Sequence, residues 1–208
     1  MKRAMIPAIV VLFATLASAQ TPVKTLEGGV LDEIKLFVET PGTPAQLAVV
    51  FRPFAADTAD LGTGGKEGKE KRQTEAQLIQ TQGPQMLADS AAAALRKDGP
   101  FTSVAAIAGD AATPPGALVV EGRFTEINPG SRAKRYFAGF GAGKSVVEVI
   151  GTVKDAEGRT LASFRQRRIG AMGMGGGDSL GKLLSDTRSI GEDIARFLAA
   201  WARGKSLD

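Results

Sequence analysis

The sequence has 208 residues, a length that favours one domain with short appendages. Hydrophobic residues make up 43% and charged residues 23%, a balance that excludes wholesale disorder and collagen-like structure. The formal net charge is +4, and the chain contains neither His nor Cys. This absence excludes disulfide bonds, thiolate or imidazole catalysis, and zinc or haem sites built on Cys or His ligands.

The first nineteen residues have the pattern of a secretory signal. Lys2 and Arg3 precede an apolar run that ends at Leu16, and small residues follow up to Ala19. The run is shorter than the ~20 residues that span a bilayer, which favours a cleaved signal over a membrane anchor. We expect cleavage between Ala19 and Gln20 and a periplasmic or secreted protein. No Cys follows the run, so we expect no lipid anchor.

Residues 20–45 contain scattered Pro and Gly around one short strand expected at 34–39, which predicts a loosely ordered N-terminal arm. Residues 46–204 are expected to form a single domain, and 205–208 a short tail. This domain is predicted to contain a strand, a helix, two strands, a hairpin and a helix. In chain order they lie at 46–54, 84–98, 101–108, 117–127, 146–153 with 160–169, and 189–203. The order predicts an α/β (α+β) fold with helices packed on a single mixed β-sheet.

Two of these helix boundaries rest on local sequence signals. Gly83 and Pro84 interrupt the helical periodicity, and proline suits the first position of a helix. Ser189 and Glu192 have the spacing of a capping box, which predicts that the final helix begins at Ser189. The apolar residues after this box recur on one helical face and predict core packing: Ile190, Ile194, Phe197, Leu198 and Trp201.

The register of the expected hairpin depends on the turn between its strands. A four-residue loop, 155–158, with Gly158 in the left-handed conformation, sets Val149 opposite Phe164 and Glu148 opposite Arg165. One face then carries Val147, Val149, Val153, Ala162 and Phe164, and the other carries Lys144, Glu148, Thr152, Arg165 and Arg167. A three-residue loop with a bulge would shift the partners by one residue and mix the faces.

Residues 138–145 match a relaxed phosphate-binding loop, because Lys144 and Ser145 follow closely spaced glycines. In such a loop the backbone N–H groups bind phosphate, and a helix begins directly after it. The β-branched residues after Ser145 predict a strand instead. We therefore interpret the segment as a glycine-rich turn that enters a strand, and we expect no bound nucleotide.

Residues 177–181 match two signatures of serine hydrolases, in which Ser179 would be the nucleophile. Both signatures need a His that accepts the serine proton, and the chain has none. We favour a helix start with Asp178 or Ser179 as its cap. A His-free hydrolase that uses Ser179 or carboxylates is the weakest functional hypothesis.

The segment 130–144 contains the most concentrated basic and aromatic residues of the chain. A long connection between two strands is often functional, so we predict a binding surface here. Its candidate binding residues are Arg132, Lys134, Arg135, Tyr136, Phe137 and Phe140. The alternative is a solvated charged loop. We expect no metal, cofactor or nucleic acid partner, since removal of the signal would leave an exported chain with little net charge.

The run from Leu118 to Lys144 resembles an exported bacterial family known as domain of unknown function 4410. Its most specific parts are residues 130–132 and 139–144. The resemblance extends over roughly residues 46–203. It implies an α/β envelope domain, similar to the N-terminal domains of envelope assembly proteins, and it assigns no catalytic residues.

These observations lead to three functional hypotheses of different classes. The first is a non-enzymatic envelope module for binding or assembly, with an envelope protein as partner and with self-association open. The second is a periplasmic carrier of a small ligand or lipid, which would need a large apolar cavity. The third is the His-free hydrolase.

Overall fold

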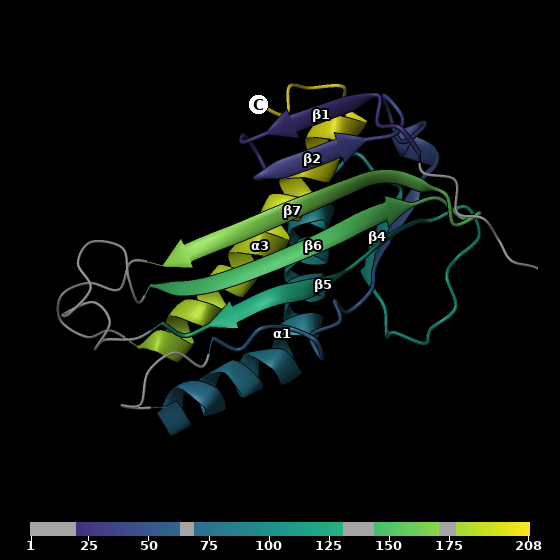
Figure 1. Cartoon of the computed structure of the whole chain (residues 1–208). Helices are drawn as coiled ribbons and strands as arrows, with labels where there is room; N and C mark the ends of the chain where they lie inside the picture. Colours follow the sequence, from purple (N-terminus) through teal and green to yellow (C-terminus); the bar gives the residue numbers. More distant parts are fainter. Residues whose placement is uncertain (1–19, 63–68, 131–143, 171–177) are drawn as a thin grey trace, which may run out of the picture.

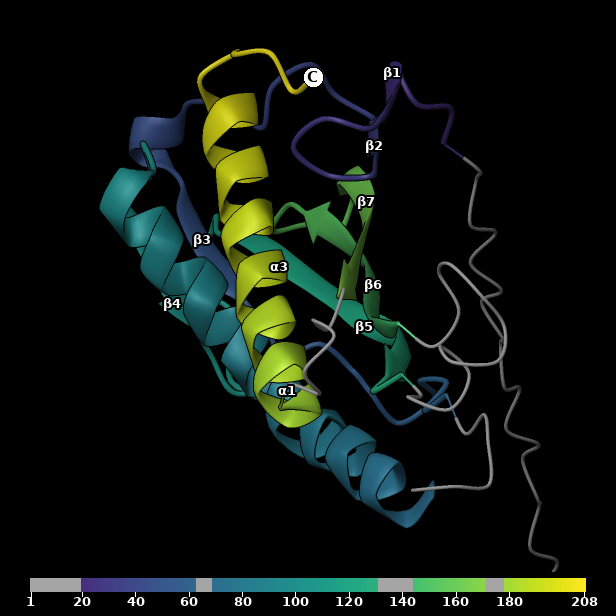
Figure 2. The same cartoon turned by 90° about the vertical axis from the view of Figure 1, so that its left-hand side faces the viewer.

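The structure is a computed structural model that describes residues 20–62, 69–130, 144–170 and 178–208. In this part of the chain two helices cover one face of a seven-stranded sheet, and the other face is open (Figures 1 and 2). The helices are α1 (Lys69–Asp98) and α3 (Ser179–Ala202), and a short 3-10 helix spans Pro44–Gln46. Across the sheet lie β1 (Lys24–Glu27), β2 (Glu33–Leu36), β7 (Thr160–Gly170), β6 (Ser145–Lys154), β5 (Leu118–Asn128), β3 (Ala48–Phe51) and β4 (Ser103–Ala106).

The sheet is mixed, which confirms the predicted α+β fold. Strand β3 pairs in parallel with β4 and β5, while the remaining neighbours are antiparallel. The predicted sequence of strand, helix, strand, strand, hairpin and helix is present from β3 to α3. No helix in the described residues is long and apolar enough to cross a membrane.

The segment 20–45 is more ordered than the expected loose arm, because it supplies β1 in addition to β2, which overlaps the strand expected at 34–39. Strand β2 pairs with β7, and Ile34 and Leu36 are buried against the helical layer. The expected tail is also held in place, since the Val30 N–H donates to the carbonyl of Leu207, which is buried. The four residues of β1 carry too short an alternation to stand out from a Pro- and Gly-rich background, and pairing with β2 stabilises them only in the folded chain.

The predicted break at Gly83 and Pro84 is wrong, because α1 continues through both residues. Pro84 removes one helical hydrogen bond to Gln80, and the helix is bent (Figures 1 and 2). A Cβ atom at Gly83 would lie 3.3 Å from Cζ of Phe124, so this position packs closely on the sheet. Packing along the buried face of α1 therefore outweighs the local penalty of the proline.

The final helix begins ten residues earlier than its predicted start. Asp178 is the N-cap residue of α3, as the alternative for the hydrolase motif predicted, although its side chain accepts no capping hydrogen bond. Ser189 therefore lies inside the helix, and the capping-box prediction is wrong. At Gly191 the two helices approach so closely that a Cβ atom would lie 2.6 Å from the carbonyl oxygen of Leu87.

The hairpin has the predicted faces but a different register. Its turn is the three-residue loop, with Gly158 at φ 81°, and the Asp155 N–H donates to the Arg159 carbonyl at 3.0 Å. A bulge at Leu161 adds a second shift, so Val149 pairs with Gln166 and not with Phe164. Two single-residue shifts sum to an even number, which returns each side chain to its predicted face.

Candidate functional site

The residues predicted to form a binding loop, Arg132, Lys134, Arg135, Tyr136, Phe137 and Phe140, lie outside the described residues, as does Ala19 at the expected cleavage site. The structure does describe the residues directly after the glycine-rich segment. A strand follows this segment, as predicted: β6 begins at Ser145, one residue before its expected start, where a phosphate-binding loop would continue into a helix.

Ser179, the nucleophile of the hydrolase hypothesis, is the first residue of α3. Its hydroxyl donates a 2.5 Å hydrogen bond to Oε2 of Glu75, which is only 6% exposed. Lys71 lies 3.7 Å from the same carboxylate. The described contacts of Ser179 thus join the start of α3 to α1.

The open face of the sheet contains a groove of about 660 Å³. Adjacent strands place side chains in rows across this face. One row runs from Glu33 on β2 through Arg165 on β7 and Ile150 on β6 to Arg123 on β5. Arg165 and Arg123 therefore flank Ile150 on the floor of the groove.

A second row on the same face lies two residues away along each strand. It contains Lys35, Ser163, Thr152 and Glu121. Two hydroxyl groups thus lie in the middle of this row, with charged side chains at both ends. These two rows combine one apolar side chain, Ile150, with hydroxyl groups and charged side chains.

The charges of the groove are unequally neutralised. The Glu33 carboxylate forms ion pairs with Nζ of Lys35, at 2.7 Å, and with Nε of Arg165, at 3.4 Å. Lys154 lies 2.7 Å from Glu121 and neutralises it. Arg123 is exposed and forms no ion pair with any described acidic residue. Positive charge therefore exceeds negative charge within the groove.

These neighbours shift the pKa of Glu33. The hydrogen bond from Lys35 lowers the pKa of the Glu33 carboxyl below its ordinary value. Burial opposes this shift, while the charge of Lys35 and the contact with Arg165 add to it. The carboxylate is thereby held in its charged form.

One wall of the groove is a loop that Arg52 holds. Its guanidinium donates to the carbonyls of Gly109 and Ala111, the latter at 3.1 Å, and to the Thr113 hydroxyl at 2.9 Å. Pro53, Ala55 and Gly109 line the groove on this side. The opposite wall is β2, which supplies Glu33 and Lys35.

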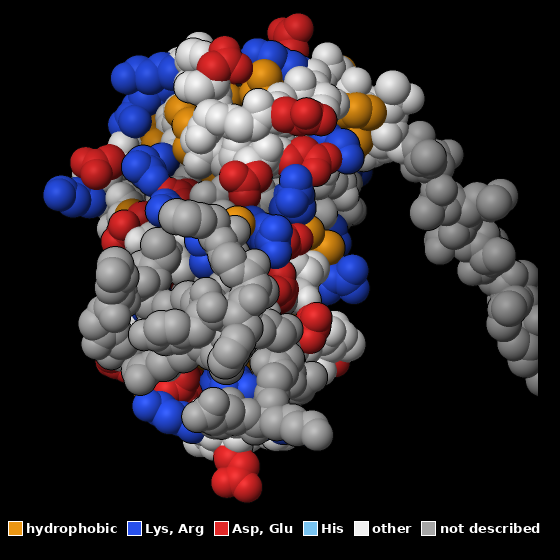
Figure 3. Space-filling model, turned by 60° about the vertical axis from the view of Figure 1, so that its left-hand side comes forward, with side chains coloured by type: hydrophobic (Ala, Val, Ile, Leu, Met, Phe, Trp, Pro, Cys, Tyr) orange, Lys and Arg blue, Asp and Glu red, His pale blue; other side chains and the backbone are white. Residues whose placement is uncertain are grey.

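At the other end of the open face, the charged side chains are paired differently. Arg167 contacts two carboxylates, Glu126 at 2.9 Å and Glu148 at 3.1 Å. Figure 3 shows acidic and basic side chains side by side on the described part of the surface in view. Among the described residues, Arg167 is thus neutralised by two carboxylates.

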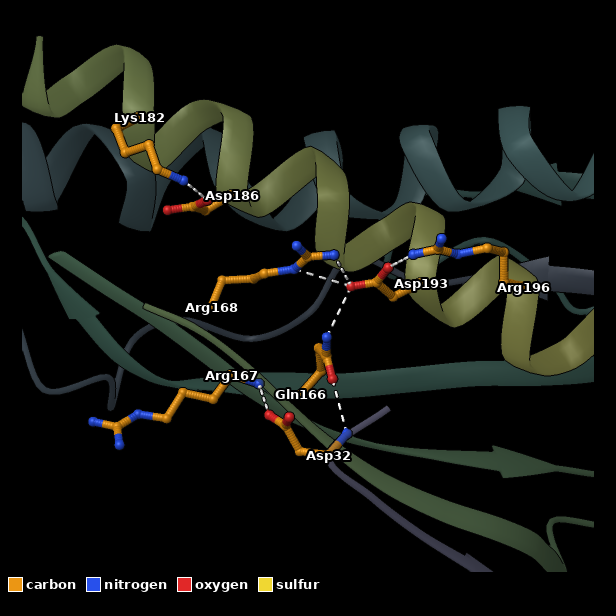
Figure 4. Close-up of polar contacts among 8 residues, drawn as sticks. All are labelled: Asp32, Gln166, Arg167, Arg168, Lys182, Asp186, Asp193 and Arg196. Atoms are coloured by element: carbon orange, nitrogen blue, oxygen red, sulfur yellow. Dashed lines mark hydrogen bonds and ion pairs between the residues drawn. The ribbon is translucent and has the colours of Figure 1, made fainter. Parts of the chain in front are cut away.

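Behind β7, a polar network fixes the strand to α3 (Figure 4). Asp193 is 1% exposed and accepts from Gln166 at 2.8 Å, from Arg168 and from Arg196. Gln166 in turn accepts from the Asp32 N–H at 3.0 Å, and the Asp32 carboxylate accepts from the Arg167 N–H at 2.6 Å. The network holds β2, β7 and α3 together and so positions Arg165 and Arg167.

Figure 4 also shows a second acidic residue of α3, Asp186, paired with Lys182. Asp186 is 4% exposed, and its Oδ2 has no hydrogen-bond partner among the described residues. The Ser145 hydroxyl nearby is likewise unpaired within the described residues. The described residues contain no group of three or more metal-ligating side chains.

Comparison with known proteins identifies the family. Residues 49–174 match the family model described as Domain of unknown function (DUF4410). The chain belongs to this family. The matched range includes Arg123, Ile150 and Arg165, whereas Glu33 and Lys35 of the opposite wall lie outside it. No curated protein matches the chain.

Several solved structures are similar to this chain. A variant of the PelC dodecamer from Paraburkholderia phytofirmans has 15% identity and a TM-score of 0.43 over 78% of this chain and 95% of that chain. The PelC dodecamer of the same organism has 14% identity and a TM-score of 0.42 over 77% and 96%. An uncharacterized protein has 14% identity and a TM-score of 0.41 over 76% and 95%.

The sequence indicated part of the groove. The polar face predicted for the hairpin included Thr152 and Arg165, and both lie in the groove. Arg123 and Lys35 were missed, because the pairing of β5 and β2 with this hairpin is a long-range property. Their charge alone does not distinguish them from solvated surface residues.

Proposed function

We propose that this protein is an exported, non-enzymatic module of the bacterial cell envelope that binds a partner through the open face of its sheet. The signal-like N-terminus supports export. The lack of His and Cys supports a non-enzymatic role, since the common nucleophile–imidazole and thiolate mechanisms need these residues.

The observation that carries the proposal is the difference between the two faces of the sheet. The helices bury one face in the core, while the other presents paired and unpaired charges around a groove. Packing of the core explains why one face is buried, but it does not explain the groove on the other face. A concave surface with a few converging polar groups is typical of binding sites.

Site-specific photocrosslinking in the native organism tests the proposed surface. A photoreactive residue in place of Thr152 should capture a partner that mass spectrometry identifies. The matched control is the same residue in place of Gln77, which is exposed on α1. Equal capture from both positions, or capture from position 77 alone, would contradict the proposal.

Export is tested separately by N-terminal sequencing of the protein recovered outside the cytoplasm. We expect the chain to begin at Gln20. An intact Met1 would contradict the cleaved signal. Analytical ultracentrifugation of the same material tests self-association as part of the proposed assembly role, and a monomer at all concentrations would remove that part.

A carrier of a small polar ligand is a second candidate, and the volume of the groove favours it. Its volume of about 660 Å³ lies within the ~300–1,000 Å³ typical of small-molecule sites. Its floor is mixed in polarity, with Ile150 beside Thr152 and Ser163. This composition favours a polar ligand over a lipid.

The hydrolase hypothesis has a direct test at Ser179. Ser179→Ala should leave any esterase activity of the preparation unchanged, because no imidazole activates the hydroxyl. It should also lower stability by about 1–2 kcal/mol, because the buried Glu75 loses a hydrogen-bond donor. Covalent labelling of Ser179 by a fluorophosphonate probe would contradict the non-enzymatic assignment.

A further inference from the structure

The arrangement of Arg123 and Arg165 indicates which ligand chemistry the groove accepts. We propose that it binds a compact organic anion, whose carboxylate or phosphate lies between Arg123 and Arg165 and whose body lies over Ile150. This inference rests on the proposed binding role of the open face and adds the class of ligand to it.

The spacing of the two arginines suits one acidic group. They occupy β5 and β7, which lie on either side of β6, and both pair directly with Ile150. Neighbouring strands are ~4.8 Å apart, so their Cα atoms are roughly 10 Å apart. Two arginine side chains can converge from this distance on one carboxylate or phosphate, a group that guanidinium binds well.

The charge balance leaves both arginines able to bind. Arg123 has no acidic partner among the described residues. Arg165 has one acidic contact within the described part of the chain, at 3.4 Å with Glu33, whose shorter contact, 2.7 Å, is with Lys35. An incoming anion would therefore add the missing negative charge without displacing a strong ion pair.

The surroundings favour a small ligand with a hydroxylated body. The hydroxyl groups of Ser163 and Thr152 lie in the row beside Arg165 and Ile150 and can bond to polar groups of the ligand. The loop held by Arg52 and the strand β2 bound the groove on opposite sides. These walls leave room in the groove for a molecule of sugar size.

Titration calorimetry of the exported chain at about 0.15 M salt tests the ligand class. The probes are glucuronate, glucose 6-phosphate and glucose, which share one body and differ in the acidic group. We expect at least one of the two acids to bind saturably and glucose not to bind. The acid that binds more tightly, glucuronate or glucose 6-phosphate, shows whether the site prefers carboxylate or phosphate.

Two matched variants locate the site. Arg123→Gln should weaken binding at least tenfold, while Arg167→Gln, on the same face but already paired with two acids, should change it less than twofold. Thermal unfolding confirms that both variants fold. Failure of both acids to bind, or equal weakening by the two variants, would overturn the inference. If position 152 still captures a partner while neither acid binds, the anion site is wrong and the proposed function stands.

Discussion

Two arginines on the open face of the sheet, Arg123 and Arg167, have opposite surroundings. Arg167 is held between Glu126 and Glu148, whereas Arg123 has no acidic partner among the described residues. Arg123 lies on β5 and Arg167 on β7 of the same sheet, and the same two helices cover its opposite face. The comparison shows that one sheet face can contain a self-neutralised end and an unsatisfied, cationic end. We assign a structural role to the first and a binding role to the second.

Removal of the packing that holds β7 should have the greatest effect on stability. Phe164 is 4% exposed, and its ring lies 6.4 Å from Phe54 and 6.0 Å from Phe197. Phe164→Ala should cost about 3–5 kcal/mol of unfolding free energy, because it leaves a cavity beneath the groove. Chemical denaturation measures this value, and a loss below about 1 kcal/mol would show that the sheet does not depend on this contact.

The polar network behind β7 should have the next largest effect. Asp193→Asn removes the negative charge that Arg168 and Arg196 share, and we expect a loss of about 2–3 kcal/mol. The matched control is Glu192→Gln, an exposed acid on the same helix, which should change stability by no more than about 0.5 kcal/mol. Equal effects of the two substitutions would contradict the role given to the network.

The two arginines themselves should differ in stability. Arg167→Gln should cost about 0.5–1 kcal/mol, because it leaves Glu126 and Glu148 close together without a cation. Arg123→Gln should change stability by less than about 0.5 kcal/mol, because it breaks no ion pair among the described residues. Denaturation at low and high salt checks the origin of the difference, which should shrink as salt screens the charges. The reverse order of the two effects would invalidate the comparison.

The smallest expected effect concerns Glu33 and acid. Its pKa is lower in the folded chain than in the unfolded chain, so its contribution to stability is present above the unfolded pKa and is lost as pH falls through the folded pKa. Glu33→Gln should therefore lose less stability than the native chain between about pH 5 and 3, by a few tenths of a kcal/mol. Identical acid profiles would show that the contact with Lys35 and Arg165 adds nothing.

The sequence predicted the fold where local patterns and burial agree. Strands β3 to β7 and the apolar stripe of α3 follow from alternation and helical periodicity. The prediction failed where long-range packing overrides a local signal. Pro84 lies within α1 because its buried face continues on both sides, and the Ser189 capping box lies inside α3 for a similar reason.

The candidate site was predicted less well than the fold. A hairpin face can be deduced from alternation, but its register changed through two local irregularities that only the folded turn reveals. The row of Glu33, Arg165, Ile150 and Arg123 depends on pairing between residues far apart in sequence. The basic and aromatic loop chosen from composition lies outside the described residues, and its role stays a prediction.

Chemical-shift mapping by NMR distinguishes the two ends of the sheet, because it shows where an anion binds on the open face. A chain of residues 20–208 is titrated with glucuronate and with glucose 6-phosphate, and backbone amide shifts are followed at both ends of the sheet. We predict that the largest saturable shifts occur around Arg123, Ile150 and Arg165, with little change around Glu126 and Glu148. Shifts centred on Arg167, or no saturable shifts with either acid, would contradict an anion site between Arg123 and Arg165.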